Sequence, residues 1–188
     1  MEAIVLFAEG FEEIEGLSIV DILRRADISC RIITTKDEVV IGAHRIPIIS
    51  NGSIETLNLD EINAVILPGG SPGYLNLADD ERVLDLIRHM NRNDRIIGAI
   101  CAAPFVLAKA GILNNKNATI YPGMEKEIIN AGGRYHDDIV VRDETIITSR
   151  GPATAIPFAL HLVEILKDKK TSDEISKKLL TDLVMKDM

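Results

Sequence analysis

The chain contains two cysteines, and one of them, Cys101, stands where a nucleophile could be presented. It follows the aliphatic run 96–100, which predicts a buried strand, and precedes a helix predicted over residues 102–110. A sharp strand-to-helix turn exposes its central side chain at the carboxyl end of a sheet, where open α/β folds build their sites. The alternative is a small buried hydrophobic residue, which is the usual environment of a free cysteine. The position in the turn favours the nucleophile.

A nucleophilic thiol needs help to ionise at neutral pH. The N–H groups at a helix start lower a cysteine pKa by about one unit, which is too little from a value near ~8.5. A hydrogen bond from a neutral acid would lower it by roughly one to two more units. Glu15 is the candidate donor, and burial must keep it protonated because an ionised Glu15 would repel the thiolate. Glu12 and Glu13 are explained by the dipole of the helix that they begin.

A glycine-rich turn over residues 67–73 follows the third predicted strand. The backbone N–H groups of Gly70 and Ala102 could form an anion or oxyanion pocket over the sulfur. The alternative is a plain turn. A phosphate-binding loop is excluded because its Gly-Lys-Ser/Thr ending is missing.

Neither histidine nor metal chemistry is predicted. No histidine adjoins Cys101, and His136 with the two aspartates after it is too little for a metal site. His89 and His161 are expected on helix surfaces, and His44 and His136 in loops. We therefore expect no metal and no cofactor.

Five short aliphatic runs alternate with helical patterns, which predicts a mostly parallel sheet of an α/β fold. The predicted strands are 3–8, 30–35, 64–67, 96–100 and 145–148, and the predicted helices are 12–25, 80–90, 102–110, 123–130 and 154–167. In the first helix one apolar stripe is predicted, formed by Ile14, Leu17, Val20 and Leu23. Hairpins are expected at 138–148 and at 39–48, where Pro47 marks an edge strand.

The last segment predicts one amphipathic helix at about 172–185. Thr171 and Glu174 have the spacing of a capping box, and Ile175, Leu179, Leu183 and Val184 share a face. With no repeat or linker in the sequence, we expect residues 1–188 to form a single domain that includes this helix.

Composition limits the partners. The chain has 188 residues and a formal charge of −8, with 4% aromatic residues and no tryptophan, so nucleic acid is not expected as a partner. The apolar runs are too short to span a membrane, and no basic leader precedes the first one. We expect a cytoplasmic protein in which Cys30 and Cys101 are free thiols, with Cys30 packed in the core.

Four ordered motifs carry a family resemblance: Ala-Glu-Gly-Phe-Glu-Glu-Ile-Glu at 8–15, Leu-Pro-Gly-Gly at 67–70, Gly-Ala-Ile-Cys-Ala-Ala-Pro at 98–104 and Thr-Ser-Arg-Gly-Pro-Ala-Thr at 148–154. Over residues 2–184 the chain resembles the ThiJ/PfpI superfamily, specifically the DJ-one branch of parkinsonism-associated deglycases. The resemblance implies a flavodoxin-like three-layer sandwich, a homodimer, a reactive Cys101 paired with protonated Glu15, and an anion pocket from Gly70 and Ala102. It also implies glyoxalase III or deglycase activity on a small carbonyl substrate, or oxidant sensing through cysteine sulfinate.

The sequence departs from the family pattern at Tyr121, where some members carry an active-site histidine. A tyrosine with a pKa near ~10 is a poor base at neutral pH, so base chemistry would fall to Glu15 or water. The peptidase branch has histidine directly after its cysteine, where this chain has Ala102, so protease activity is disfavoured. Two functions remain: a cofactor-free enzyme acting on 2-oxoaldehydes or their protein adducts, and an oxidative-stress sensor or redox chaperone that acts through Cys101.

Overall fold

A central sheet of six strands forms the middle layer of the molecule. The structure, a computed structural model, describes residues 2–36 and 38–186. The strand order is β2-β1-β5-β6-β10-β9, and all neighbours are parallel except β9 and β10. The predicted parallel sheet is confirmed, with strand ends within two residues of expectation. The strands are β1 (Glu2–Phe7), β2 (Ser29–Thr34), β5 (Ile62–Leu67), β6 (Ile96–Ile100), β9 (Val140–Asp143) and β10 (Ile146–Ser149).

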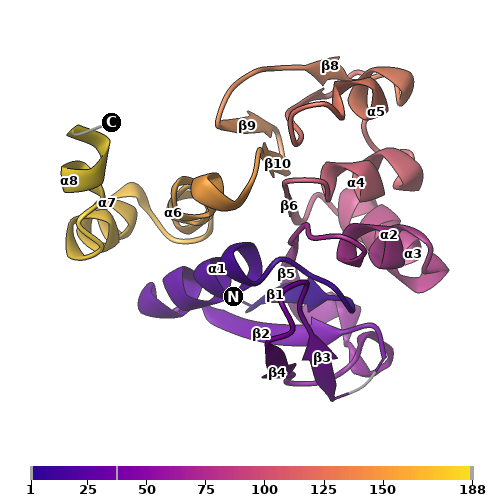
Figure 1. Cartoon of the computed structure of the whole chain (residues 1–188), viewed down its shortest axis with the longest axis horizontal. Coiled ribbons are helices and arrows are strands. Elements are labelled where there is room, and N and C mark those ends of the chain that lie inside the picture. Colours follow the sequence, from indigo (N-terminus) through magenta and orange to yellow (C-terminus); the bar gives the residue numbers. More distant parts are fainter. Residues whose placement is uncertain (1, 37, 187–188) are drawn as a thin grey trace.

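Helices cover both faces of the sheet (Figure 1). One face packs against α1 and α6, and α7 packs in turn against α6; the other face packs against α2, α3, α4 and α5. Alternate residues of β1 enter the two cores, with Val5 on the α1 side and Ile4 on the other. The helices are α1 (Glu13–Arg25), α2 (Gly73–Ala78), α3 (Glu81–Arg92), α4 (Pro104–Ala110), α5 (Glu125–Asn130), α6 (Ala155–Leu166), α7 (Lys169–Lys178) and α8 (Thr181–Lys186).

The strand order creates a crevice at the carboxyl end of the sheet. The chain passes from β1 outward to β2 and then returns to β5 on the other side of β1. The loops that leave β1 and β5 therefore diverge, and such switch points are where open α/β sheets bind ligands. The loop after β6 reaches the same edge, since β6 lies beside β5.

The buried face of α1 differs from the predicted stripe. Val20 and Leu23 are buried as expected, but Ile14 is 59% exposed. Gly16 lies against the sheet instead, where a Cβ would come within 2.7 Å of the Phe7 ring. Because this close approach sets the rotation of the helix, Ile14 turns outward and the neighbouring Glu15 inward.

Two hairpins confirm the predictions. The first joins β3 (Val39–Ile41) to β4 (Pro47–Ile49) in a separate two-stranded sheet, and β9 pairs with β10 in the second. Several short elements lack a periodic sequence signal and were not predicted. They are α2, a parallel pair of β7 (Asn117–Ala118) with β8 (Arg134–Tyr135), and 3-10 turns at Ile54–Thr56, Leu59–Glu61 and Pro152–Thr154.

The prediction of a single C-terminal helix is wrong. Asp168 caps α7 by accepting from the backbone N–H of Thr171, so the helix starts before the predicted capping box. The chain then breaks at Leu180, which has a φ of 60°, and continues as α8. The apolar pattern runs across this break, so periodicity alone gave no sign of it. In the described part of the chain, no helix has the length and apolar character needed to cross a membrane.

Candidate active site

Cys101 lies in a tight turn between β6 and α4. The helix starts at Pro104, so the predicted start at Ala102 is wrong and the cysteine is separated from the helix by two turn residues. Cys101 has a φ of 63°, a left-handed conformation that is uncommon for residues other than glycine. Its N–H donates to the Ser149 carbonyl at 3.0 Å, and its carbonyl accepts from the Tyr121 N–H at 2.9 Å. These bonds to neighbouring segments hold the turn, and the side chain is half-buried.

Glu15 reaches the same place from α1. Its side chain is fully buried, and Oε2 accepts a hydrogen bond from the Gly69 N–H at 2.7 Å. Its other oxygen, Oε1, is buried without a hydrogen-bond partner in the described structure. A Cβ at Gly69 would lie 2.7 Å from Cys101 Cβ and 3.0 Å from Glu15 Oε2. Only glycine fits there, so the thiol and the carboxyl group border the same small volume.

The two titratable groups are electrostatically coupled. Burial raises the pKa of Glu15 to about 7, against the opposing effect of the Gly69 hydrogen bond. This is the direction expected for a carboxyl group removed from water. Burial also raises the pKa of Cys101, and so does the negative charge of Glu15 when that group is ionised. The pair therefore holds at most one negative charge near neutral pH, and its titration belongs to both groups.

Two backbone N–H groups point at the sulfur. The hydrogen bonds from Ala102 and Gly70 act against burial and lower the pKa of Cys101. Gly70 has a φ of 93°, and a Cβ there would collide with the backbone N–H of Glu12, so glycine is required on both counts. The structure thus brings together four of the residues that the sequence singled out: Cys101, Glu15, Gly70 and Ala102.

Tyr121 stands at the edge of this site. Its backbone contacts the Cys101 carbonyl, while its side chain is 46% exposed and its ring faces Gly151. The phenol is therefore partly exposed to solvent, whereas Glu15 is fully buried.

The sequence reasoning missed the role of Glu13. Its side chain is buried and bonded to the turn between β3 and β4, including the ring of His44 at 3.0 Å. With Glu12 these side chains have ligand atoms within 4.8 Å of one another, the spacing of a metal-binding group. Because both Glu13 oxygens already accept hydrogen bonds, we assign the group to anchoring the turn. Two acids at a helix start, with a histidine in a nearby hairpin turn, were the available signal.

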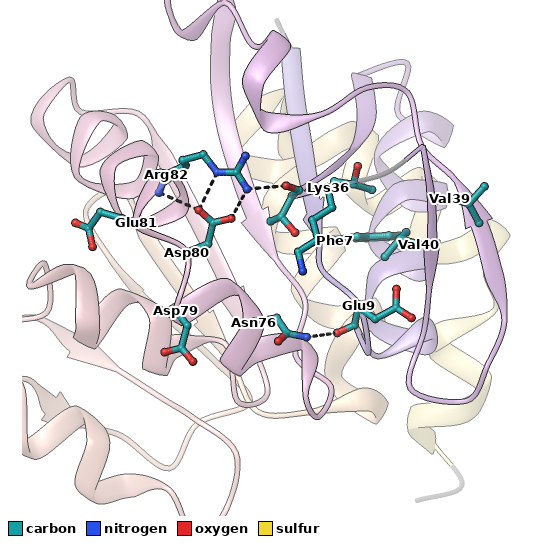
Figure 2. Close-up of a pocket in the computed structure, with 12 residues that line it drawn as sticks. Phe7, Glu9, Lys36, Val39, Val40, Asn76, Asp79, Asp80, Glu81 and Arg82 are labelled. Atoms are coloured by element: carbon teal, nitrogen blue, oxygen red, sulfur yellow. Dashed lines mark hydrogen bonds and ion pairs between the residues drawn. The ribbon is translucent and has the colours of Figure 1, made fainter.

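A pocket of about 440 Å³ lies beside the site, at the carboxyl ends of β1 and β2 (Figure 2). Within it Arg82 binds Asp80, and the Asn76 side chain donates to the Glu9 carbonyl at 2.7 Å. The residues that line this pocket include neither Cys101 nor Glu15. Charged side chains that pair with one another, such as Arg82 and Asp80 at the start of α3, line the pocket, and the Cys101 thiol lies outside it.

Comparison with known proteins identifies the family of the chain. The sequence matches the DJ-1/PfpI family over residues 1–165. The chain belongs to the DJ-1/PfpI family. The crystal structure of Drosophila melanogaster DJ-1beta matches with a TM-score of 0.92 at 39% identity, over 95% of this chain and 97% of that one. The sandwich is therefore the flavodoxin-like fold of DJ-1 proteins, as the sequence resemblance implied.

Two relatives in the DJ-1/PfpI family carry names that describe an activity. One is the glutathione-independent glyoxalase DJR-1.2 of Caenorhabditis elegans, 32% identical over 94% of this chain and 94% of its own length. The other is a deglycase of Pyrococcus abyssi, 29% identical over 89% of this chain and 100% of its own length.

Proposed function

We propose that this protein is a cofactor-free enzyme that uses Cys101 to convert 2-oxoaldehydes such as methylglyoxal to 2-hydroxy acids, or to remove their adducts from proteins. One observation carries the proposal: a fully buried glutamic acid and two backbone N–H groups converge on a half-exposed cysteine in a strand-to-helix turn. The activities named for the two relatives support the same substrate class.

The first step is addition of the sulfur to the aldehyde carbon. The pair of Cys101 and Glu15 loses one proton, which comes mainly from Glu15 because burial and the Glu15 charge raise the pKa of Cys101 above that of Glu15. The reactive form is the minor one, in which the charge lies on Cys101 and the proton on Glu15. The S–C bond forms as the carbonyl π electrons move to oxygen, which gives a hemithioacetal. The Gly70 and Ala102 N–H groups, already directed at the sulfur, stabilise the developing oxyanion. The Glu15 proton then passes to that oxygen, which leaves Glu15 ionised.

The second step moves a hydrogen within the substrate. Glu15, once ionised, removes the proton from the former aldehyde carbon and returns it to the neighbouring carbonyl carbon through an enediol, while the hydroxyl proton passes from the oxygen of the first carbon to the oxygen of the second. The result is a thioester of lactate on Cys101, which water hydrolyses to lactate and the free thiol. The aldehyde carbon is oxidised and the ketone carbon reduced, so no external oxidant or cofactor is required. A pKa of about 7 suits Glu15 to both roles.

The base in this scheme is Glu15 rather than Tyr121. Tyr121 is half-exposed, while Glu15 is fully buried beside the sulfur. We propose that Tyr121→Phe keeps most of the turnover, since the scheme requires no proton transfer from the phenol.

The test is lactate formation from methylglyoxal without glutathione, followed by coupled assay or NMR. We expect Cys101→Ser to lower kcat/KM by at least about 10²-fold because it removes the nucleophile. Cys30→Ser is the matched control, since Cys30 is buried in β2 and its pKa is raised by burial to about 12. Turnover that survives in Cys101→Ser would rule out the mechanism.

The second candidate function is sensing of oxidants through Cys101 sulfinate, as an oxidative-stress sensor or redox chaperone. The difference in exposure between the two thiols favours it, because Cys101 is half-buried while Cys30 is packed in the core. Mass spectrometry after mild peroxide treatment should find oxygen added first at Cys101. Equal oxidation of both thiols would remove the basis of this function.

The same family membership supports a proposal for the assembly and the location. We propose that the protein is a homodimer and works in the cytoplasm, where a reducing environment keeps both cysteines as the free thiols described here. Neither nucleic acid nor a membrane is a proposed partner. The proposed small-molecule partners are the carbonyl substrate and, for sensing, the oxidant.

A further inference from the structure

Glu13 is a buried acid that the proposed chemistry does not use. It is the first residue of α1, its side chain is only 5% exposed, and Glu15 follows two positions later. Residues two apart on a helix point in different directions. Glu15 therefore faces Cys101 while Glu13 faces outward from the site, toward the turn between β3 and β4.

The hairpin turn surrounds the Glu13 carboxylate. Oε1 accepts from the backbone N–H of His44 at 2.8 Å and of Ile46 at 3.4 Å, and Oε2 lies 3.0 Å from His44 Nδ1. Burial alone would raise the pKa of Glu13, but these bonds outweigh it and the pKa is lowered. A Cβ at Gly42 would collide with the carboxylate. The turn thus fits closely around an ionised Glu13.

The same turn is bonded to the loop that leads into α1. The Ala43 N–H donates to the Phe11 carbonyl at 2.8 Å, and the Gly10 N–H donates to the Ile41 carbonyl at 2.8 Å. On the inner side, the Glu12 N–H donates to the Gly69 carbonyl at 3.0 Å. Gly69 in turn donates to Glu15. A continuous series of hydrogen bonds therefore links the hairpin turn to the acid beside Cys101.

We propose that Glu13 is a positioning residue: by binding the β3–β4 turn it fixes the first turn of α1 and so holds Glu15 in place against Cys101. The inference rests on the proposed function of Cys101 and Glu15. Glu13 has no contact with the sulfur and acts through the helix start. Its partners are mainly backbone N–H groups, so its acceptor oxygens matter more than its charge.

The test is the pH dependence of Cys101 alkylation by iodoacetamide in the full chain, with Cys30→Ser as the common background. Glu13→Gln keeps an acceptor oxygen for the two N–H groups, so we expect its profile to match that of the background protein. Glu13→Ala removes the acceptor. We expect its alkylation rate at neutral pH to change by roughly tenfold or more, and its midpoint to move by more than about half a pH unit toward an ordinary thiol near ~8.5.

Glu81→Ala is the matched control, because Glu81 also begins a helix, at α3, but its side chain is exposed and pairs with Arg88 of the same helix. It should leave the profile unchanged. If Glu13→Ala does not fold, Gly42→Ala serves in its place, since the added methyl group displaces the carboxylate while Glu13 remains. An unchanged profile in the folded variant, or a Glu13→Gln profile as altered as that of Glu13→Ala, would overturn the proposal.

Failure of the proposed function gives a different result. In that case the background protein itself would show an ordinary thiol profile that Glu15→Gln leaves unaltered. The Glu13 proposal fails alone when Glu15→Gln shifts the profile and loss of the Glu13 acceptor does not.

Discussion

At the scale of single residues, the site depends on one strained cysteine and one buried acid. A left-handed conformation costs a residue other than glycine about 1–2 kcal/mol. At Cys101 it is held by hydrogen bonds to Ser149 and Tyr121, and it turns the thiol toward Glu15. Gly69 leaves the space in which the two side chains meet. The left-handed backbone of Cys101 and the absence of a side chain at Gly69 together place the sulfur beside the carboxyl group of Glu15.

The buried acid should make stability depend on pH. The pKa of Glu15 is raised from 4.5 to about 7, so between these values the folded protein binds more protons than the unfolded one. The contribution of this shift to the free energy of unfolding is fully present below pH 4.5 and is lost as pH rises through about 7. Glu15→Gln cannot ionise. We therefore compare the unfolding free energies of wild type and Glu15→Gln. The wild-type value minus the Glu15→Gln value should fall by about 3 kcal/mol as pH rises from 4.5 to above about 7.

Urea unfolding across this pH range measures that difference, and other titrating groups largely cancel because both proteins contain them. A difference that stays constant with pH would mean that Glu15 keeps an ordinary pKa in the folded state.

At the scale of elements, α1 controls the site through how closely it packs on the sheet. Gly16 allows the helix to approach the Phe7 ring, which stacks on Phe11 with centroids 4.0 Å apart. The same approach turns Glu15 inward and Ile14 outward. The position of one glycine thus sets the rotation of the helix that carries the acid.

Gly16→Ala should weaken both packing and reactivity. The added methyl group would lie 2.7 Å from the Phe7 ring, which is fully buried and stacked on Phe11. Overpacking of this kind typically costs about 1–3 kcal/mol, which outweighs the ~1 kcal/mol that alanine gains over glycine in a helix. We expect a lower melting temperature and slower Cys101 alkylation. Ser18→Ala, on the same helix, is the control, and equal behaviour of the two variants would contradict this packing role.

At the scale of the whole molecule, an apolar surface lies beside the site. Ile14 at the start of α1 is 59% exposed, Ile46 in the hairpin turn 48% and Ile49 in β4 70%. The Glu13 hydrogen bonds join the helix to this hairpin, so Ile14 and Ile46 belong to neighbouring segments. Apolar surface on adjacent elements is typical of an interface. We expect the proposed homodimer to use it.

Ile46→Glu should therefore convert the dimer to a monomer, because it places a charge within the apolar contact. Size-exclusion chromatography with light scattering measures the mass directly. Ile129→Glu is the matched control, since Ile129 on α5 is 56% exposed in another part of the fold. A dimer that persists in Ile46→Glu but not in Ile129→Glu would place the interface on the α5 side.

Much of the fold could be predicted because its signals are local. Aliphatic runs identified the strands of the central sheet, and the helix predicted to end at residue 110 does end there, before Gly111 with a φ of 78°. Prediction failed where a tertiary contact or a backbone break overrides the pattern. The C-terminal apolar periodicity continues past Leu180 although the chain turns there, and Ile14 fits a helical stripe although Gly16 turns it toward solvent.

From the sequence alone came the alternation of strands and helices, the turn that contains Cys101 and the family motifs, because periodicity, turn residues and motif order are written along the chain. Only the tertiary structure decided which groups the acids at the start of α1 contact. Glu15 turns to the sulfur and Glu13 to the hairpin, since their surroundings come from segments remote in sequence that packing brings together. Burial, which sets the pKa of Glu15, likewise exists only once the sheet and helices have closed around it.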